Sequence, residues 1–398
     1  LSARLSLSAQ SMEIEQNGLG FNNLIFMAVV LSELAKNPEA AYRGLIVEEP
    51  EAHLHPQLQR VLLRYLAGIP TKEGEKPVQL FVTSHSPNFA SNSKLESLVC
   101  LVENEAGVET FFPRDVQFAK GKREKLERYL DVTRAELFFA RRVIFVEGAA
   151  ELMLVDALAK VLGFDLREYG VSLISVEGLN FDSFLPLFGE NGLRIPVSVI
   201  TDADPFEEEE VSEPAAAERP DEEIQEELLA EAAYLDEAGA KNGDVAGRLA
   251  DESGESKKKK KLKAAYPSLG EAVRISSNTL KMKESEDQFV KVHHGVKTLE
   301  YDLALQAENR DAMLKALAEL HPRISVALQK IVDGVPDNTA KAKALFCGMF
   351  ERKDTNSNVQ KGRFGQALAE QIALTPGFKV PEYLEQAIRH VCQGADKP

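Results

Sequence analysis

Carboxylates that directly follow short apolar runs are the residues of this chain best suited to chemistry. "VIFVEG", residues 143–148, ends in Glu147 and Gly148, and "ITDADP", residues 200–205, carries Asp202 and Asp204 after its apolar part. Glu151 lies one helical turn beyond Glu147. Clustered carboxylates repel one another unless cations bind, and oxygen-rich sites favour Mg²⁺, Mn²⁺ or Ca²⁺ over zinc. Two such ions about 4 Å apart would activate a water and stabilise the leaving oxygen of a phosphodiester.

The elements around these acids predict a parallel sheet. From residue 141 the chain shows an apolar strand, the helical pattern "AAELMLVDALAKVLG", the strand "VSLISVEG", a short helix at "FDSFLPLF" and the strand "PVSVITDADP". Strands alternating with helices indicate parallel pairing. The carboxyl ends of such strands meet at one crevice, so we expect Glu147, Asp202 and Asp204 to lie there together.

A second acidic motif lies nearer the start of the chain. "GLIVEEPEAHLHP", residues 44–56, is an apolar strand followed by Glu48 and Glu49, and "VTSHS" places His85 after another strand. In nucleotide-binding ATPases the first acid holds Mg²⁺, the second orients the attacking water, and a histidine at this place can sense the γ-phosphate. Gly18 and Gly20 in "NGLGFNNL" come before a predicted helix, whose first amides suit phosphate oxygens. The alternative is a purely structural role, in which these acids only cap a turn.

The phosphate-binding loop G-x-x-x-x-G-K-[ST] does not occur in this sequence. The ATPase half-site is therefore incomplete, and we expect no ATP hydrolysis by this piece. We expect the missing half N-terminal to Leu1, with the chain being a fragment of a longer protein.

Both motif pairs resemble known families. "EEPEAHLHP" with "TSHSP" resembles the C-terminal half of an ABC-type ATPase domain of the SMC/RecF-like kind, with Glu48 where that pattern usually has Asp. "VIFVEG" with "ITDADP" resembles a Toprim domain. An ABC-type ATPase followed directly by a Toprim domain is the architecture of the OLD (overcoming lysogenisation defect) family, which this chain resembles over nearly its whole length.

This resemblance implies a metal-dependent DNA endonuclease that nicks or cleaves DNA with two Mg²⁺ ions, or Mn²⁺ or Ca²⁺. It also implies ATP binding together with the missing N-terminal half, a homodimer formed through the ATPase region, and a role in phage defence or DNA repair. The metal ligands that it implies are Glu147, Glu151, Asp202, Asp204 and Glu300, with Asp302 as a further candidate; Glu147 would also be catalytic, and Lys361 in "KGRFGQALAE" would be the catalytic lysine. On the residues alone, Lys361 is one lysine before a predicted helix and is better explained as a solvated side chain; only the resemblance makes a catalytic role equally plausible.

We therefore expect an α/β chain with a Rossmann-like parallel Toprim sheet. The predicted layout is the C-terminal half of an ABC-type ATPase domain at 1–115, a basic connector at 116–140, a Toprim domain at 141–300 with an acidic mobile insert at 206–272, and a helical region at 301–398 that completes the nuclease site.

Charge and composition bear on partners and location. The chain carries 63 acidic and 47 basic residues, a net charge of −16, which opposes DNA binding. We expect bound cations to reverse the local field, while basic residues within 120–142 and 257–263 contact phosphates. Three widely spaced cysteines predict a reducing, cytoplasmic setting, and we expect no membrane span because no apolar run is long enough.

Two other functions stay open. A topoisomerase or primase could use the same Toprim acids, although none of the eight tyrosines has an obvious nucleophile setting. A RecF/SMC-like repair ATPase with a non-catalytic Toprim is the second. Retained acids disfavour the latter, because unpaired clustered carboxylates destabilise a fold.

Overall fold

The computed structural model describes residues 8–9, 12–13, 18–35, 42–68, 78–104, 107–178, 180–210, 260–352 and 358–393. The chain divides into two compact units, Leu1–Asp204 with Tyr266–Pro398, and Pro205–Ala265. Residues 211–259, which make up most of the acidic insert predicted to be mobile, lie outside the described residues.

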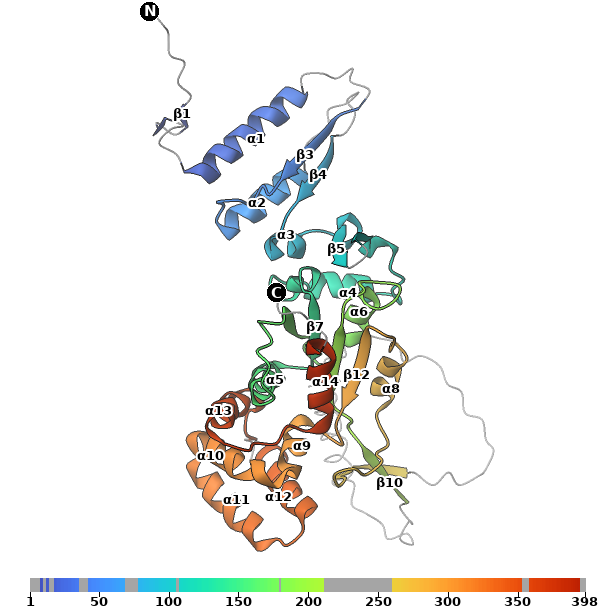
Figure 1. Ribbon diagram of the computed structural model, residues 1–398, viewed down its shortest axis with the longest axis vertical. Coiled ribbons are helices and arrows are strands. Elements are labelled where there is room, and N and C mark those ends of the chain that lie inside the picture. Colours follow the sequence, from blue (N-terminus) through green and yellow to red (C-terminus); the bar gives the residue numbers. More distant parts are fainter. Residues whose placement is uncertain are drawn as a thin grey trace, which may run out of the picture. The chain divides into compact units, whose positions relative to one another are not determined.

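A four-stranded parallel sheet is the centre of the larger unit (Figure 1). The sequence predicts parallel pairing and three of these strands, whereas the fourth, β12, is seen only in the structure. The strand order is β12-β9-β7-β8, with every neighbouring pair parallel. The strands are β7 (Arg142–Val146), β8 (Val171–Ser175), β9 (Val197–Thr201) and β12 (Val290–His294). All five residues of β9 are buried, because both faces of a parallel sheet are covered. The α/β fold class is therefore confirmed.

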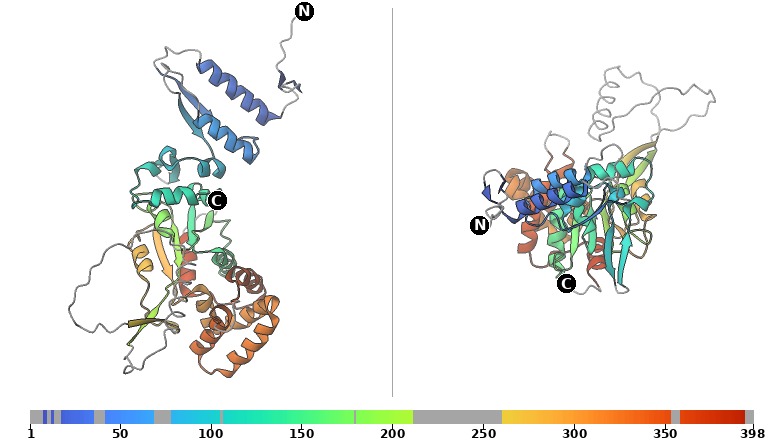
Figure 2. Two further views of the ribbon diagram at one scale, coloured as in Figure 1. Left: turned by 180° about the vertical axis from the view of Figure 1, so that it is seen from behind. Right: turned by 90° about the horizontal axis from the view of Figure 1, so that it is seen from above.

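Alternate residues of these strands belong to two separate cores. Ile144, Val146 and Ile200 face one core, while Val143 and Phe145 face the other. The first core is completed by α5 (Ala149–Val161), α9 (Leu299–Leu305), α10 (Arg310–Leu320), α11 (Pro322–Gly334), α12 (Asn338–Phe350), α13 (Lys361–Leu374) and α14 (Glu382–Cys392). The short helix η6 (Ala307–Asn309) comes between α9 and α10. The second lies under α4 (Lys122–Tyr129), η4 (Arg134–Phe138), α6 (Phe181–Phe184), η5 (Leu185–Leu187) and α8 (Ser277–Lys283). Helices α10 to α13 pack on one another (Figure 2).

The N-terminal part is built on a second, smaller parallel sheet. Strands β3 (Gly44–Glu48) and β4 (Gln79–Thr83) pair in parallel, and α1 (Leu19–Ala35) and α2 (Pro56–Ala67) contribute to a core with Met27, Leu62 and Phe89. Helix α2 begins at Pro56 because His55 Nδ1 accepts a hydrogen bond from the Gln57 amide. The remaining elements up to residue 115 are β1 (Ser8–Ala9), β2 (Met12–Glu13), α3 (Pro87–Asn92), η2 (Leu95–Ser97), β5 (Cys100–Asn104), β6 (Gly107–Phe111) and η3 (Pro113–Asp115).

The smaller unit contains an antiparallel pair, β10 (Phe206–Glu210) and β11 (Lys260–Ala264). In its backbone register, Glu207 lies opposite Lys263 and Glu209 lies opposite Lys261. The described ends of the predicted mobile insert are thus strands. Residues from Tyr266 onward belong to the larger unit, whereas the sequence places the end of the insert at residue 272.

Within the described ranges, no helix combines the length and apolarity that a membrane span requires.

Candidate functional site

Glu147 and Asp202 lie side by side at the carboxyl edge of the sheet. Glu147 follows the last residue of β7, and Asp202 follows the last residue of β9. One carboxylate oxygen of Glu147 accepts hydrogen bonds from the Thr201 hydroxyl at 2.7 Å and from the Asp202 amide at 2.9 Å. The side chain of Glu147 is therefore fixed across the gap between two adjacent strand ends.

Glu300 and Lys361 form an ion pair that joins two helices. Glu300 is in the first turn of α9 and is 1% exposed, while Lys361 is the first residue of α13. The Lys361 Nζ donates to Glu300 Oε2 at 3.0 Å. The other oxygen, Glu300 Oε1, is buried without a hydrogen-bond partner. An unsatisfied buried carboxylate oxygen is costly, so this atom is a candidate ligand for a cation.

Close packing of two helices positions Lys361 beside the sheet. Helices α5 and α13 are in extensive contact. A Cβ on Gly365 of α13 would lie 3.1 Å from the Ala150 Cα and 3.2 Å from its Cβ, so glycine permits this approach. Glu151 follows Ala150 in α5 and Lys361 lies one turn before Gly365, so the contact brings both side chains towards Glu147.

The pKa shifts in this site have one common origin. Burial, followed by the negative charges of Glu147, Glu300 and Asp204, raises the pKa of Asp202 well above its usual range, with Lys361 partly offsetting this. Burial and Glu300 also raise the pKa of Glu151. For Lys361, burial lowers the pKa, but Glu300, Asp202 and Glu151 outweigh it and the net shift is upward. The carboxylates repel one another, and a cation relieves that repulsion.

Asp204 and Asp302 differ from the other predicted ligands. Asp204 is exposed and has a left-handed backbone with φ 44°, two residues after Asp202. Asp302 is 5% exposed, and its carboxylate accepts the amides of Val296 at 3.2 Å and Lys297 at 3.3 Å. Burial is the main cause that raises the pKa of Asp302 to about 8, and these amide bonds oppose it. Its oxygens therefore hold the turn that follows β12.

The donor set suits hard divalent cations, because all four acidic side chains that the structure brings together here offer carboxylate oxygen. As they lie, no three Asp, Glu, His or Cys side chains among the described residues enclose an ion. Mg²⁺ commonly uses one or two carboxylates, completed by water and substrate phosphate, instead of an all-protein cage. Together with the unpartnered Glu300 Oε1, this arrangement fits such an ion.

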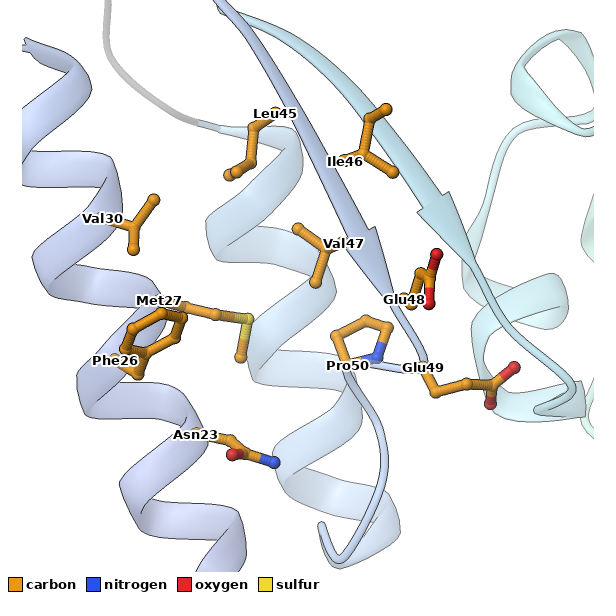
Figure 3. A pocket seen from close by; sticks show the side chains of 10 residues that line it. All are labelled: Asn23, Phe26, Met27, Val30, Leu45, Ile46, Val47, Glu48, Glu49 and Pro50. Atoms are coloured by element: carbon orange, nitrogen blue, oxygen red, sulfur yellow. The ribbon is translucent and has the colours of Figure 1, made fainter.

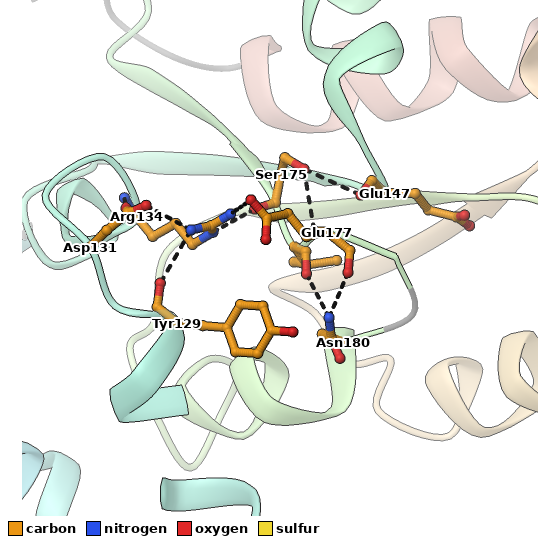
Figure 4. A network of polar contacts seen from close by, with 8 residues as sticks. Tyr129, Asp131, Arg134, Glu147, Ser175, Glu177 and Asn180 are labelled. Atoms are coloured by element: carbon orange, nitrogen blue, oxygen red, sulfur yellow. Dashed lines mark hydrogen bonds and ion pairs between the residues drawn. The ribbon is translucent and has the colours of Figure 1, made fainter. Parts of the chain in front are cut away.

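A polar network holds the backbone around Glu147 (Figure 4). The Ser175 hydroxyl at the end of β8 donates to the Glu147 carbonyl at 3.2 Å, and the Gly178 amide donates to the same carbonyl at 2.8 Å. Arg134, whose side chain is 11% exposed, donates to the Ser175 carbonyl at 2.9 Å and pairs with Glu177 at 2.6 Å. Arg134 thus ties η4 to the loop that supports Glu147.

The acids of the N-terminal motif line a separate cavity of about 270 Å³ (Figure 3). Glu48 and Glu49 lie at one end of it, and Asn23 and Met27 of α1 lie opposite. The His85 Nε2 is 3.4 Å from Glu49 Oε1, with both side chains accessible.

Glu51, which the sequence does not single out, links the two motifs. Its Oε1 accepts from the Ser84 hydroxyl and from the His85 amide at 3.2 Å, and its Oε2 is buried without a partner. This carboxylate fixes the loop that carries His85.

The glycines and the basic connector complete the predicted positions. Gly18 lies just before α1, and Gly20 lies in its first turn, where a Cβ would be 2.6 Å from the His53 carbonyl oxygen. Two basic residues of the connector already have partners in the fold. Lys122 pairs with Asp182, and Arg123 donates to the carbonyls of Arg114 and Val116. These contacts leave fewer of its charges for phosphates than the sequence predicts.

Several residues of the larger site carry weak sequence signals. Thr201 stands between the strand and Asp202, so its place at a strand end could have identified it. Arg134 and Ser175 contact Glu147 or its loop only through the fold. No periodicity or motif marks them.

Comparison with protein families places two domains on this chain. Residues 138–204 match the overcoming lysogenization defect protein-like TOPRIM domain, and residues 3–90 match an AAA ATPase domain.

Curated relatives carry nuclease names. The chain is 28% identical over 227 residues to endonuclease GajA of Bacillus cereus (strain HuB5-5), covering 49% of this chain and 32% of that protein. It is 27% identical over 169 residues to the OLD nuclease of Thermus scotoductus (strain ATCC 700910 / SA-01), covering 41% of this chain and 31% of that protein. The matches therefore span about a third of the length of each relative.

Solved structures give a weaker likeness. The C-terminal region of the Xanthomonas campestris pv. campestris OLD protein is 24% identical and covers 64% of this chain and 94% of that chain, with a TM-score of 0.34. The corresponding region of the Burkholderia pseudomallei OLD protein is 22% identical, with coverages of 64% and 97% and a TM-score of 0.33. At such TM-scores we draw nothing from them.

Proposed function

We propose that this chain acts as a divalent-metal-dependent DNA endonuclease, because it matches an OLD-like Toprim domain preceded by a match to an AAA ATPase domain, as its sequence motifs predict. In this proposal, DNA cleavage is coupled to an ABC-type ATPase. The nuclease names of two relatives support the reaction class.

One observation carries the proposal. Four acids from separate parts of the chain interact electrostatically at one edge of the sheet, with Lys361 among them. These acids are Glu147, Glu151, Asp202 and Glu300. A purely structural role would not require so many like charges in one place, because their mutual repulsion destabilises the fold. A reaction on a phosphodiester uses such a group of acids to bind cations.

In this proposal Glu147, Asp202 and Asp204 hold one cation, and Glu151 and Glu300 hold a second. When bound, such cations supply an activated water and stabilise the leaving oxygen. Thr201 orients Glu147 through its 2.7 Å hydrogen bond. Lys361 places a positive charge against the phosphate in the transition state.

Asp302 is the weakest of the proposed ligands, because its carboxylate already accepts backbone amides. The preferred metal is Mg²⁺, with Mn²⁺ and Ca²⁺ as the other candidates.

The N-terminal motifs belong to the nucleotide side of the same protein. Glu48 would hold Mg²⁺ of ATP, Glu49 would orient water, and His85 would sense the γ-phosphate. Gly18 and Gly20 would present amides at the start of α1. A homodimer through this region, action in a reducing cytoplasm, and a role in phage defence or DNA repair are further parts of the proposal.

Supercoiled plasmid tests the function directly. The chain is incubated with plasmid and Mg²⁺ or Mn²⁺, beside Asp202→Ala, Lys361→Ala and the control Lys330→Ala, an exposed lysine of α11. We expect nicked or linear DNA from the parent and from Lys330→Ala. Each site variant should cut about 100-fold to 1000-fold more slowly.

Changed supercoiling without breaks would point instead to a topoisomerase. Unchanged plasmid would point to a non-catalytic Toprim scaffold.

A further inference from the structure

Helix α14 runs antiparallel to the strands of the central sheet. The Ser198 hydroxyl near the start of β9 donates to the Ala387 carbonyl at 2.7 Å, and His390 contacts the Phe289 carbonyl just before β12 at 3.0 Å. The end of α14 therefore lies at the amino ends of the strands. Its first turn, with Tyr383, lies at the carboxyl edge (Figure 1).

Tyr383 reaches that edge through Gly295, the residue after β12. A Cβ on Gly295 would lie 2.8 Å from the Tyr383 Cε1 and within 1.5 Å of an Asp302 carboxylate oxygen. Cε1 neighbours the carbon that bears the hydroxyl. The hydroxyl end of the ring is therefore at the turn that precedes Thr298 and Glu300, while the ring packs against the first core.

The electrostatic surroundings of Tyr383 are those of the proposed nuclease site. Burial and then the charges of Asp302, Asp202, Glu300 and Glu151 raise the pKa of its phenol well above the usual value.

Some carboxylate oxygens at this edge already accept hydrogen bonds, whereas Glu300 Oε1 does not. Glu300 Oε2 accepts from Lys361, Glu147 accepts from Thr201, and Asp302 accepts backbone amides. Among the hydrogen bonds of the described residues, none involves the Tyr383 hydroxyl.

We propose that Tyr383 is a further catalytic residue, whose hydroxyl donates a hydrogen bond to a non-bridging oxygen of the DNA phosphate that is cut. This assignment rests on the proposed endonuclease function. An anionic substrate that binds beside a group of carboxylates needs hydrogen-bond donors around its phosphate. The phenol supplies one from α14, and Lys361 supplies one from α13. A phosphate held between the two helices is thereby oriented as well as neutralised.

Tyr383→Phe tests the proposal, because it removes only the hydroxyl and keeps the ring that packs on Gly295. Tyr301→Phe is the matched control. Tyr301 is fully buried in α9, and its hydroxyl is already used in a hydrogen bond to the Pro267 carbonyl at 2.9 Å. Single-turnover cleavage of a labelled DNA duplex is measured with Mg²⁺ over a range of enzyme concentrations.

For Tyr383→Phe we expect the maximal cleavage rate to fall about tenfold to a hundredfold. The enzyme concentration at half-maximal rate should change less than threefold, roughly, because much of the affinity for DNA comes from contacts to other phosphates. Thermal unfolding should match the parent. Tyr301→Phe should cut at close to the parental rate.

The outcomes separate the two proposals. If the parent cuts and Tyr383→Phe cuts equally fast, Tyr383 is not catalytic and the endonuclease function stands. If Tyr383→Phe loses rate only in proportion to lost folding, the residue is structural and the proposal fails. If the parent cuts no DNA, the endonuclease function fails and the Tyr383 assignment falls with it.

Discussion

Removing the positive charge of Lys361 should destabilise the fold, because the buried Glu300 carboxylate would lose its cationic partner. Glu300 is 1% exposed, its Oε2 depends on Lys361 at 3.0 Å, and its Oε1 has no partner. Breaking a buried ion pair by removing one member costs about 3–5 kcal/mol. The Lys361 side chain is 44% exposed, so solvent screening reduces the expected loss for Lys361→Met to about 2–4 kcal/mol.

The double variant should be more stable than the single one. With Glu300→Gln added, no buried charge remains, and we expect Lys361→Met with Glu300→Gln to unfold within about 1 kcal/mol of the parent. Glu300→Gln alone loses the ion pair but also relieves repulsion with Asp202 and Glu151, so its effect should be small. The cycle should show a coupling of roughly 2–3 kcal/mol between the two positions.

Urea unfolding at neutral pH with a metal chelator measures the cycle, and Lys330→Met supplies the value for an exposed lysine. Additive single effects would refute the argument, since they would mean that the two side chains do not depend on each other. A loss for Lys361→Met no larger than for Lys330→Met would refute it equally.

Three further predictions concern the neighbourhood of the site. Arg134→Met should lower the free energy of unfolding by about 2–4 kcal/mol, because buried carbonyls lose their hydrogen-bond donor. Glu177→Gln changes a side chain that is 64% exposed and should cost at most about 1 kcal/mol. Equal losses for the two variants in urea unfolding would contradict this prediction. Burial, then His390 and nearby lysines, lower the pKa of His293 to about 4, so the folded state binds fewer protons than the unfolded state as the pH falls from the ordinary 6.5 towards 4. The stability that the neutral His293 contributes is therefore present above pH 6.5 and is lost as the pH falls below it. Replacing His293 with Asn should remove about 1–2 kcal/mol of the fall in unfolding free energy between pH 7 and pH 5. An unchanged fall would exclude His293 as its source. Gly295→Ala should cost about 2–4 kcal/mol, because its Cβ would collide with the Asp302 carboxylate, and a thermal midpoint equal to the parent's would show that the turn yields freely.

The position of the strand-end acids could be predicted because it depends on local pattern. An apolar run of about five residues forms a buried strand, and the first polar residue after it must leave the sheet at its end. Parallel pairing then brings such ends to one edge. Glu147 and Asp202 meet for this reason, with a hydrogen bond from the Asp202 amide to the Glu147 carboxylate. For Glu300 and Lys361 the sequence offered only a family resemblance, since nothing local relates two residues 61 positions apart.

What the sequence by itself determined is thus the parallel sheet, its order of strands and helices along the chain, and the acids at the strand ends. Only the tertiary structure decided which helices pack beside the carboxyl edge of the sheet. The contact of Gly365 with Ala150 brings Lys361 to the acids, and the antiparallel course of α14 brings Tyr383 there. The physical reason is that periodicity tells which face of a helix is buried, whereas its partner depends on the fit of side chains from distant parts of the chain.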